Sequence, residues 1–250
     1  HSIGRTTRGL VDRLDKTRFE TVVLPIEPLV DDDIATAIRS AADRTVPLPR
    51  NLARAREIIA ALQLDVLFFQ DIGMEAFTYF LAFSRLARVQ CVSFGHPDTT
   101  GIPAMDYFIS NSFFERGDAA SDYSETLFQL KDLGTLAYYY RPVAVPGDPT
   151  AMRALFPAGA RIYLCPQTLF KLHPDFDEIL RAILRKDSQA HVALIDQGPT
   201  VWSGQVRDRI VGQYPRLAPR LHFIPRQPGD AFLTLLAAAD VILDPTFFNG

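Results

Sequence analysis

Cysteine is scarce in this sequence, and its two cysteines are poorly placed for a disulfide framework. The 250 residues include two cysteines, three methionines and one tryptophan. Cys91 and Cys165 lie far apart, each inside an apolar run, which is typical of buried reduced thiols. We therefore expect a cytoplasmic protein without disulfides.

Long apolar runs are also missing. No run of about 18 apolar residues is present to span a bilayer, and the first residues lack the apolar centre of a signal peptide. We expect no membrane span. The chain starts without a methionine and stops directly after an apolar strand, so we also expect that both ends are cut.

Neither sign of charge dominates. Lys and Arg number 26 against 29 Asp and Glu, a formal net charge of −3 without long runs of one sign. This balance excludes the basic face of a nucleic-acid-binding protein. Any phosphate must be bound by a few local groups.

Several cofactor motifs are absent as well. The sequence has no GxGxxG, no GxxxxGK[ST] and no CxxC, and its five histidines lack the paired spacing of metal ligands on a helix. These absences lower the expectation of a dinucleotide cofactor or a nucleotide-hydrolysing P-loop. We expect neither a metal nor a cofactor.

Apolar runs alternate with helical stretches along the chain. Such alternation is typical of βαβ units with parallel strands, and nearly continuous apolar strands indicate a sheet covered on both faces. The expected helices include 31–42, 51–62 and a well-buried 73–87, with two more beginning at Pro174 and Pro228. The expected strands are 19–24, 65–70, 89–94, 106–110, 161–165, 191–196, 221–224 and 241–244.

A proline-rich stretch divides this pattern into two halves. Pro142, Pro146 and Pro149 cannot continue a helix or a central strand. We therefore expect an α/β protein with two Rossmann-like domains and parallel sheets, residues 1–145 and 146–250, the second one incomplete. Such halves bind ligands at the carboxyl ends of their strands, in the cleft between them.

Two loops that follow expected strands carry reactive groups. The loop at 95–101 reads GHPDTTG and contains an imidazole and two hydroxyls. The loop at 166–174 reads PQTLFKLHP and places the Lys171 ammonium just before a helix N-terminus, a setting that favours anions.

These loops resemble those of the O-linked N-acetylglucosamine transferase family. This is family 41 of the glycosyltransferases, which also includes the plant SPINDLY type and bacterial N-glucosyltransferases. The chain resembles the bacterial branch of the family's catalytic region. The matching stretches are collinear and span nearly the whole chain: 1–20, 89–110, 123–127, 167–171 and 239–250.

The resemblance implies a two-domain glycosyltransferase B fold and an inverting, metal-independent reaction. In this fold, residues 1–145 are expected to form the domain on the acceptor side, and residues 146–250 are expected to bind the nucleotide sugar. Lys171 matches the family lysine that neutralises the leaving diphosphate. The resemblance assigns donor binding to Gln167, Thr168, Arg226, Gln227 and Phe232.

The remaining implied site residues lie in the acceptor-side domain and at the end of the chain. His1 and His96 match family histidines, and either could assist proton transfer from the acceptor. Pro97, Thr99 and Thr100 are expected to line the sugar pocket. Asn249 and Gly250 lead toward an expected diphosphate-binding turn beyond the last residue, so we expect this piece alone to be inactive.

The favoured expectation is transfer of N-acetylglucosamine from UDP-GlcNAc onto Ser or Thr of a protein acceptor. The resemblance also implies tetratricopeptide repeats ahead of this region. UDP-glucose or GDP-fucose as the donor remains an alternative. A non-catalytic domain that binds a nucleotide sugar is a third possibility.

Overall fold

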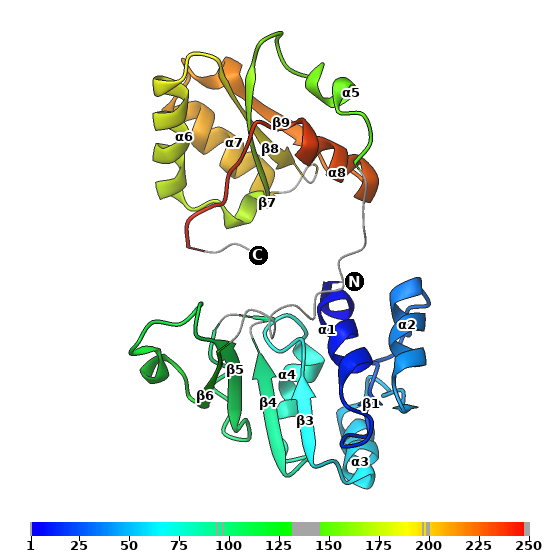
Figure 1. Ribbon diagram of the computed structural model, residues 1–250. Coiled ribbons are helices and arrows are strands. Elements are labelled where there is room, and N and C mark those ends of the chain that lie inside the picture. Colours follow the sequence, from blue (N-terminus) through cyan, green and yellow to red (C-terminus); the bar gives the residue numbers. More distant parts are fainter. Residues whose placement is uncertain are drawn as a thin grey trace. The chain divides into compact units, whose positions relative to one another are not determined.

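The computed structural model describes residues 2–93, 95–96, 98–131, 146–196, 198 and 201–247. The chain divides into two compact units, residues 1–142 and 143–250. Both are mixed α/β units with parallel sheets, which confirms the expected fold class (Figure 1). No helix in these described ranges is long and apolar enough to cross a membrane.

Unit 1 is built on a four-stranded parallel sheet with strand order β3-β4-β5-β6. A separate parallel pair, β1 and β2, lies outside this sheet. The strands of the unit are β1 (Val22–Val23), β2 (Arg44–Thr45), β3 (Val66–Phe69), β4 (Val89–Ser93), β5 (Tyr107–Asn111) and β6 (Thr126–Leu130).

Side chains cap the first turns of α2 and α3 in unit 1. Asp32 accepts a hydrogen bond from the Ala35 amide at 2.7 Å, and Asn51 accepts one from the Arg54 amide at 2.9 Å. The main core forms where α3 and α4 pack against β3, β4 and β5. The helices are α1 (Ser2–Arg13), α2 (Asp33–Ala41), α3 (Leu52–Leu62) and α4 (Ala76–Ala82).

Helix α4 differs from the expected long, buried helix 73–87. It is shorter, and its buried residues are Thr78, Leu81 and Ala82. Phe80 and Phe83 are 55% and 48% exposed and make edge contacts with Tyr79 instead. The expectation of a well-buried helix was therefore wrong, because aromatic residues on both sides of the helix concealed which face packs inward.

Unit 2 contains a four-stranded parallel sheet with strand order β10-β7-β8-β9. The chain crosses back after β9 and places β10 on the other side of β7, so the strand order reverses between β7 and β10. Ligands of open parallel sheets bind at such a reversal, outside the carboxyl ends of the strands. The strands are β7 (Arg161–Thr168), β8 (Ala190–Asp196), β9 (Leu221–Pro225) and β10 (Val241–Ile242).

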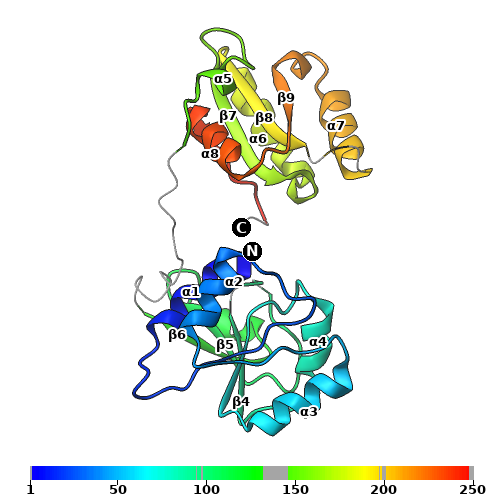
Figure 2. The same cartoon turned by 90° about the vertical axis from the view of Figure 1, so that its right-hand side faces the viewer.

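Helices cover both faces of the unit 2 sheet (Figure 2). One face packs against α6 and α7, and the other against α8 and the segment after α5. Two short 3-10 turns, 169–171 and 218–220, complete the unit. Its α-helices are α5 (Thr150–Arg153), α6 (Pro174–Lys186), α7 (Val201–Gln213) and α8 (Gly229–Ala238).

Both cysteines are buried free thiols, one in each sheet. Burial, with a smaller contribution from the charge of Asp106, raises the pKa of Cys91 to about 12. Burial also raises the pKa of Cys165, an effect that the Gln167 amide partly offsets. Neither thiol therefore has the lowered pKa of a reactive cysteine.

Candidate functional site

The carboxyl end of β7 brings together two of the expected site residues. The parallel register shifts between Cys165 and Thr168, so the strand bulges just before it ends. The 3-10 turn that follows ends at Lys171, whose Nζ donates a hydrogen bond to Gln167 Oε1 at 3.1 Å. A half-buried ammonium is thereby held directly beyond the strand.

Two buried hydroxyls lie at the same end of the sheet. Leu164 on β7 pairs with Ile242 on β10, and Thr168 and Thr246 each follow four residues later. The Oγ1 atoms of both threonines have no hydrogen-bond partner among the described residues. A buried hydroxyl without a partner costs about 1–3 kcal/mol, so both groups fit a site whose ligand supplies acceptors.

The loop after β10 packs against the loop after β7. The rings of His173 and Phe247 meet edge to face with their centroids 4.7 Å apart. We call Gln167, Thr168, Lys171 and Thr246 the β7 edge. Thr246 lies in the matching stretch 239–250 but was not singled out, because a threonine after a short strand carries no local signal of its own.

The N-terminus of α6 contributes less to this site than the sequence indicated. His173 Nδ1 already accepts a hydrogen bond from the Asp175 amide at 3.3 Å. Asp175 and Asp177 place negative charge in the first turn, where the helix dipole favours it. Of the four residues of the β7 edge, Lys171 is the one that carries a positive charge.

The residues after β9 lie at the same end of the sheet. The Arg226 amide donates to the Asp196 carbonyl at 2.9 Å, which extends the β8 and β9 pairing. Gln227 Nε2 donates to the Pro225 carbonyl at 2.7 Å. Phe232 is half-buried in the first turns of α8.

In unit 1, His96 follows β4 and packs against a glycine. A Cβ at Gly73 would lie 2.4 Å from the His96 ring, so only glycine fits there. His96 Nδ1 accepts a hydrogen bond from the Asp98 amide at 3.3 Å. This bond assigns the proton of the neutral ring to Nε2, an arrangement that suits a hydrogen-bond donor better than a base.

The hydroxyls of Thr99 and Thr100 both bind a carboxylate. Thr99 Oγ1 and the Thr100 amide donate to Glu125 at 2.7 and 2.9 Å, and the Thr100 hydroxyl donates to it as well. Glu125 is 5% exposed. Burial raises its pKa, but the hydrogen bonds from Thr100 and Thr99 outweigh burial and the pKa is lowered.

Glu125 therefore anchors the loop that carries these threonines, a role that was not expected although Glu125 lies in the matching stretch 123–127. The other expected residues, His1, Pro97, Asn249 and Gly250, lie outside the described residues. The described ranges contain no group of three or more His, Cys, Asp or Glu that could hold a metal ion.

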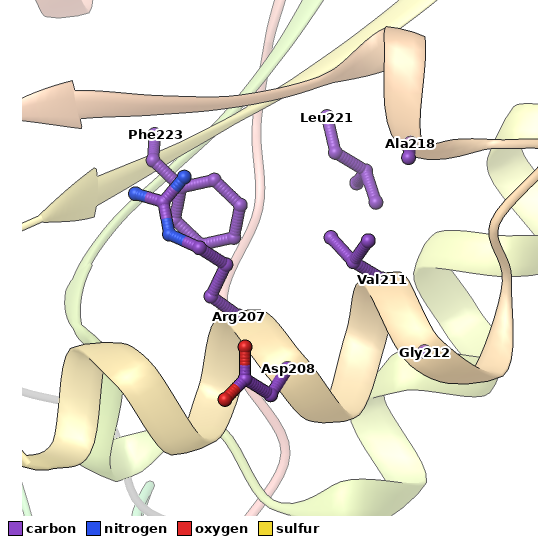
Figure 3. A pocket seen from close by; sticks show the side chains of 7 residues that line it. All are labelled: Arg207, Asp208, Val211, Gly212, Ala218, Leu221 and Phe223. Atoms are coloured by element: carbon purple, nitrogen blue, oxygen red, sulfur yellow. The ribbon is translucent and has the colours of Figure 1, made fainter.

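A pocket on unit 2 lies apart from the expected residues. It opens between α7 and β9, where Figure 3 shows the Arg207 guanidinium against the Phe223 ring and Val211 facing Leu221. The guanidinium carbon lies 4.0 Å from the ring centroid, and Arg207 also pairs with Asp196 at 3.0 Å. None of the residues expected to bind the donor lines this pocket.

Comparisons with known proteins show what the whole chain is similar to. No family model matches the chain. Two UDP-glucose:protein N-beta-glucosyltransferases of Actinobacillus pleuropneumoniae, from strains AP76 and L20, are each 29% identical over 208 residues. Each match covers 81% of this chain, which spans about a third (32%) of the relative's length.

Solved structures share the fold. A mutant O-GlcNAc transferase from Thermobaculum terrenum matches with a TM-score of 0.81 and 22% identity, over 100% of this chain and 47% of that one. Anabaena HepE, in complex with UDP and glucose, matches with a TM-score of 0.52 and 14% identity, over 96% of this chain and 68% of that one.

The fold is that of the glycosyltransferases of the B type. The resemblance seen in the sequence is confirmed: the chain is similar in sequence to protein glucosyltransferases and in fold to an O-GlcNAc transferase. Its relatives are glycosyltransferases that act on proteins.

Proposed function

We propose that this protein transfers a hexose from a UDP-linked donor to a side chain of a protein, without a metal ion. The β7 edge carries this proposal. There Lys171 Nζ donates to Gln167 Oε1 at 3.1 Å just after β7, at the strand-order reversal, and the buried hydroxyls of Thr168 and Thr246 follow the paired strands β7 and β10 at the same end of the sheet. This set offers one positive charge and several donors to a diphosphate.

The chemistry of an inverting transfer explains why such a charge is needed. The acceptor atom forms a bond to C1 of the sugar while the bond from C1 to the β-phosphate oxygen breaks. The electron pair goes to that oxygen, and the acceptor loses a proton to a base. Lys171 stabilises the negative charge that grows on the leaving diphosphate.

We propose a separate role for His96. Asp98 orients the ring, because its amide donates to Nδ1 and its carboxylate lies 3.7 Å from the same nitrogen, and Nε2 is the atom through which the ring would act on a substrate. A base role requires the Asp98 bond to break first, since only then does the ring gain a free lone pair. His1 remains the second candidate for the proton step.

The donor sugar has two candidates. N-acetylglucosamine, transferred from UDP-GlcNAc to Ser or Thr, is the expectation from the sequence and has support from the fold of an O-GlcNAc transferase. Glucose, transferred from UDP-glucose to a side-chain nitrogen, has support from the relatives with 29% identity. We rank UDP-glucose first because that likeness extends to the sequence.

The test is a transfer assay on the full-length protein with labelled UDP-glucose, UDP-GlcNAc and GDP-fucose, peptide acceptors containing Asn or Ser and Thr, and a metal chelator. We expect Lys171→Ala to lower the rate by about 10²-fold or more, because one preorganised charge is lost. Lys186→Ala, which removes an exposed lysine at the end of α6, serves as the matched control and retains the wild-type rate.

An unchanged rate in Lys171→Ala contradicts the role of this lysine. Tight binding of a nucleotide sugar without transfer to any acceptor supports instead a non-catalytic binding domain.

A further inference from the structure

One buried ion pair in unit 2 lies next to Lys171. The Asp177 carboxylate, in the first turn of α6, is 1% exposed. Arg209 on α7 binds it with two parallel hydrogen bonds, Nε to Oδ2 at 2.7 Å and Nη2 to Oδ1 at 2.9 Å. This two-pronged geometry is available to arginine and not to lysine.

The same guanidinium makes a third bond. Arg209 Nη2 donates to the Leu172 carbonyl at 2.9 Å, and Leu172 directly follows Lys171. Arg209 therefore joins α7, the first turn of α6 and the backbone beside the site lysine through one rigid group.

The backbone at Lys171 is held from its other side as well. The Leu172 amide donates to the Leu169 carbonyl at 3.0 Å, and the side chains of both leucines are buried in the core. The His173 amide donates to the Lys171 carbonyl at 3.1 Å. With its Cα fixed in this way, Lys171 has few positions from which Nζ reaches Gln167.

Stability alone does not account for the ion pair. Replacing a buried pair by apolar side chains of similar size is often neutral or stabilising, because two ions no longer lose their hydration. An apolar pair cannot supply the hydrogen bond to the Leu172 carbonyl. The property that the pair adds to the fold is the fixed position of the backbone at Lys171.

We infer that Arg209, oriented by Asp177, is a positioning residue that holds Lys171 where it meets the diphosphate of the donor. The inference rests on the proposed function. It assigns Arg209 no contact with substrate, so its effect on the reaction passes through Lys171.

Two variants test this inference. Arg209→Lys keeps the charge opposite Asp177, but one ammonium cannot reproduce the planar fork and also reach the Leu172 carbonyl. The double variant Asp177→Leu/Arg209→Met replaces the pair by apolar packing. Arg216→Lys, at an exposed arginine after α7, is the matched control.

We expect Arg209→Lys to lower kcat about tenfold to 10²-fold, as small misplacements of a reacting group do, with the acceptor KM unchanged. The double variant loses activity equally while its melting temperature stays near that of the wild type. Arg216→Lys behaves as the wild type. If the double variant does not fold, the kcat of Arg209→Lys alone decides whether the inference holds.

Coupling to Lys171 separates positioning from general support of the fold. In a Lys171→Ala background, adding Arg209→Lys has no further effect on kcat if Arg209 acts through the lysine. A full additional loss in that background overturns the inference, as does wild-type kcat in Arg209→Lys. If Lys171→Ala itself leaves kcat unchanged, the role proposed for this lysine has failed, and that outcome is read independently of Arg209.

Discussion

Gly73 shows how a single residue decides the position of a site side chain. Its φ of +94° is one that residues with a side chain rarely adopt, and a Cβ there would meet the Cδ2, Cγ and Cβ of His96 at 2.4, 2.5 and 2.9 Å. Because the clash includes the His96 Cβ, rotating the ring does not relieve it.

We therefore expect Gly73→Ala to lower the free energy of unfolding by at least about 2 kcal/mol, from backbone strain and overpacking together. Gly101→Ala is the matched control: its φ is +66°, and nothing lies within 4 Å of an added Cβ. It should cost about 1 kcal/mol from strain alone. Urea unfolding measures both, and equal losses would contradict the packing of His96 on Gly73.

Site residues differ in how far the sequence could reveal them. Lys171 and Gln167 are close in sequence and their joint placement was expected, whereas Glu125 lies far from the threonines it binds. Arg209 and Asp177 are also distant, and each reads as an ordinary surface charge on a helix. Pairings of this kind depend on how elements pack, which no local pattern encodes.

At the scale of elements, two histidines couple neighbouring strands β8 and β9. His191 Nδ1 and His222 Nε2 lie 2.8 Å apart. Burial lowers the pKa of both from 6.5, with smaller contributions from Arg220 at His191 and from His191 at His222. Since two adjacent rings cannot both be charged at low cost, the pair favours the neutral state.

This arrangement predicts sensitivity to acid. A folded-state pKa below the unfolded value contributes stability that is full above about pH 6.5 and is lost as the pH falls through the folded value. His222→Gln keeps a polar group near His191 Nδ1 but cannot take up a proton. We expect urea midpoints to fall less between pH 7.5 and pH 5 in His222→Gln than in the wild type.

His173→Asn, which removes an exposed histidine outside the pair, is the control and should show the wild-type loss. An identical decline in all three proteins would mean that the histidine pair does not contribute to the acid sensitivity.

Strands could be predicted from the sequence where nearly all of their residues are buried. β4 and β8 are apolar along nearly their whole length because helices cover both sheet faces, and both were expected close to their observed bounds. β2 has two polar residues and β6 is partly exposed, so neither shows a strand pattern. α1 was missed because it contains few apolar residues, and α7 because its apolar residues do not gather on one face.

For the whole molecule, the fold class follows from the alternation of strands and helices. The strand-order reversal between β7 and β10 does not, because an order of strands in a sheet leaves no trace in the local pattern. Because open parallel sheets bind ligands at such a reversal, it singles out the carboxyl end of β7 as the candidate site. Two features of the sequence, the Lys171 loop and the family resemblance, also point to the carboxyl end of β7.

The most direct test of the account is calorimetric titration of UDP into the purified protein in the presence of a chelator. We predict binding to the wild type and to Lys186→Ala, and an affinity at least about tenfold weaker in Lys171→Ala, because the diphosphate then loses its cation. Equal affinities in all three proteins, or binding that requires a divalent ion, would contradict the claim that Lys171 meets the diphosphate charge.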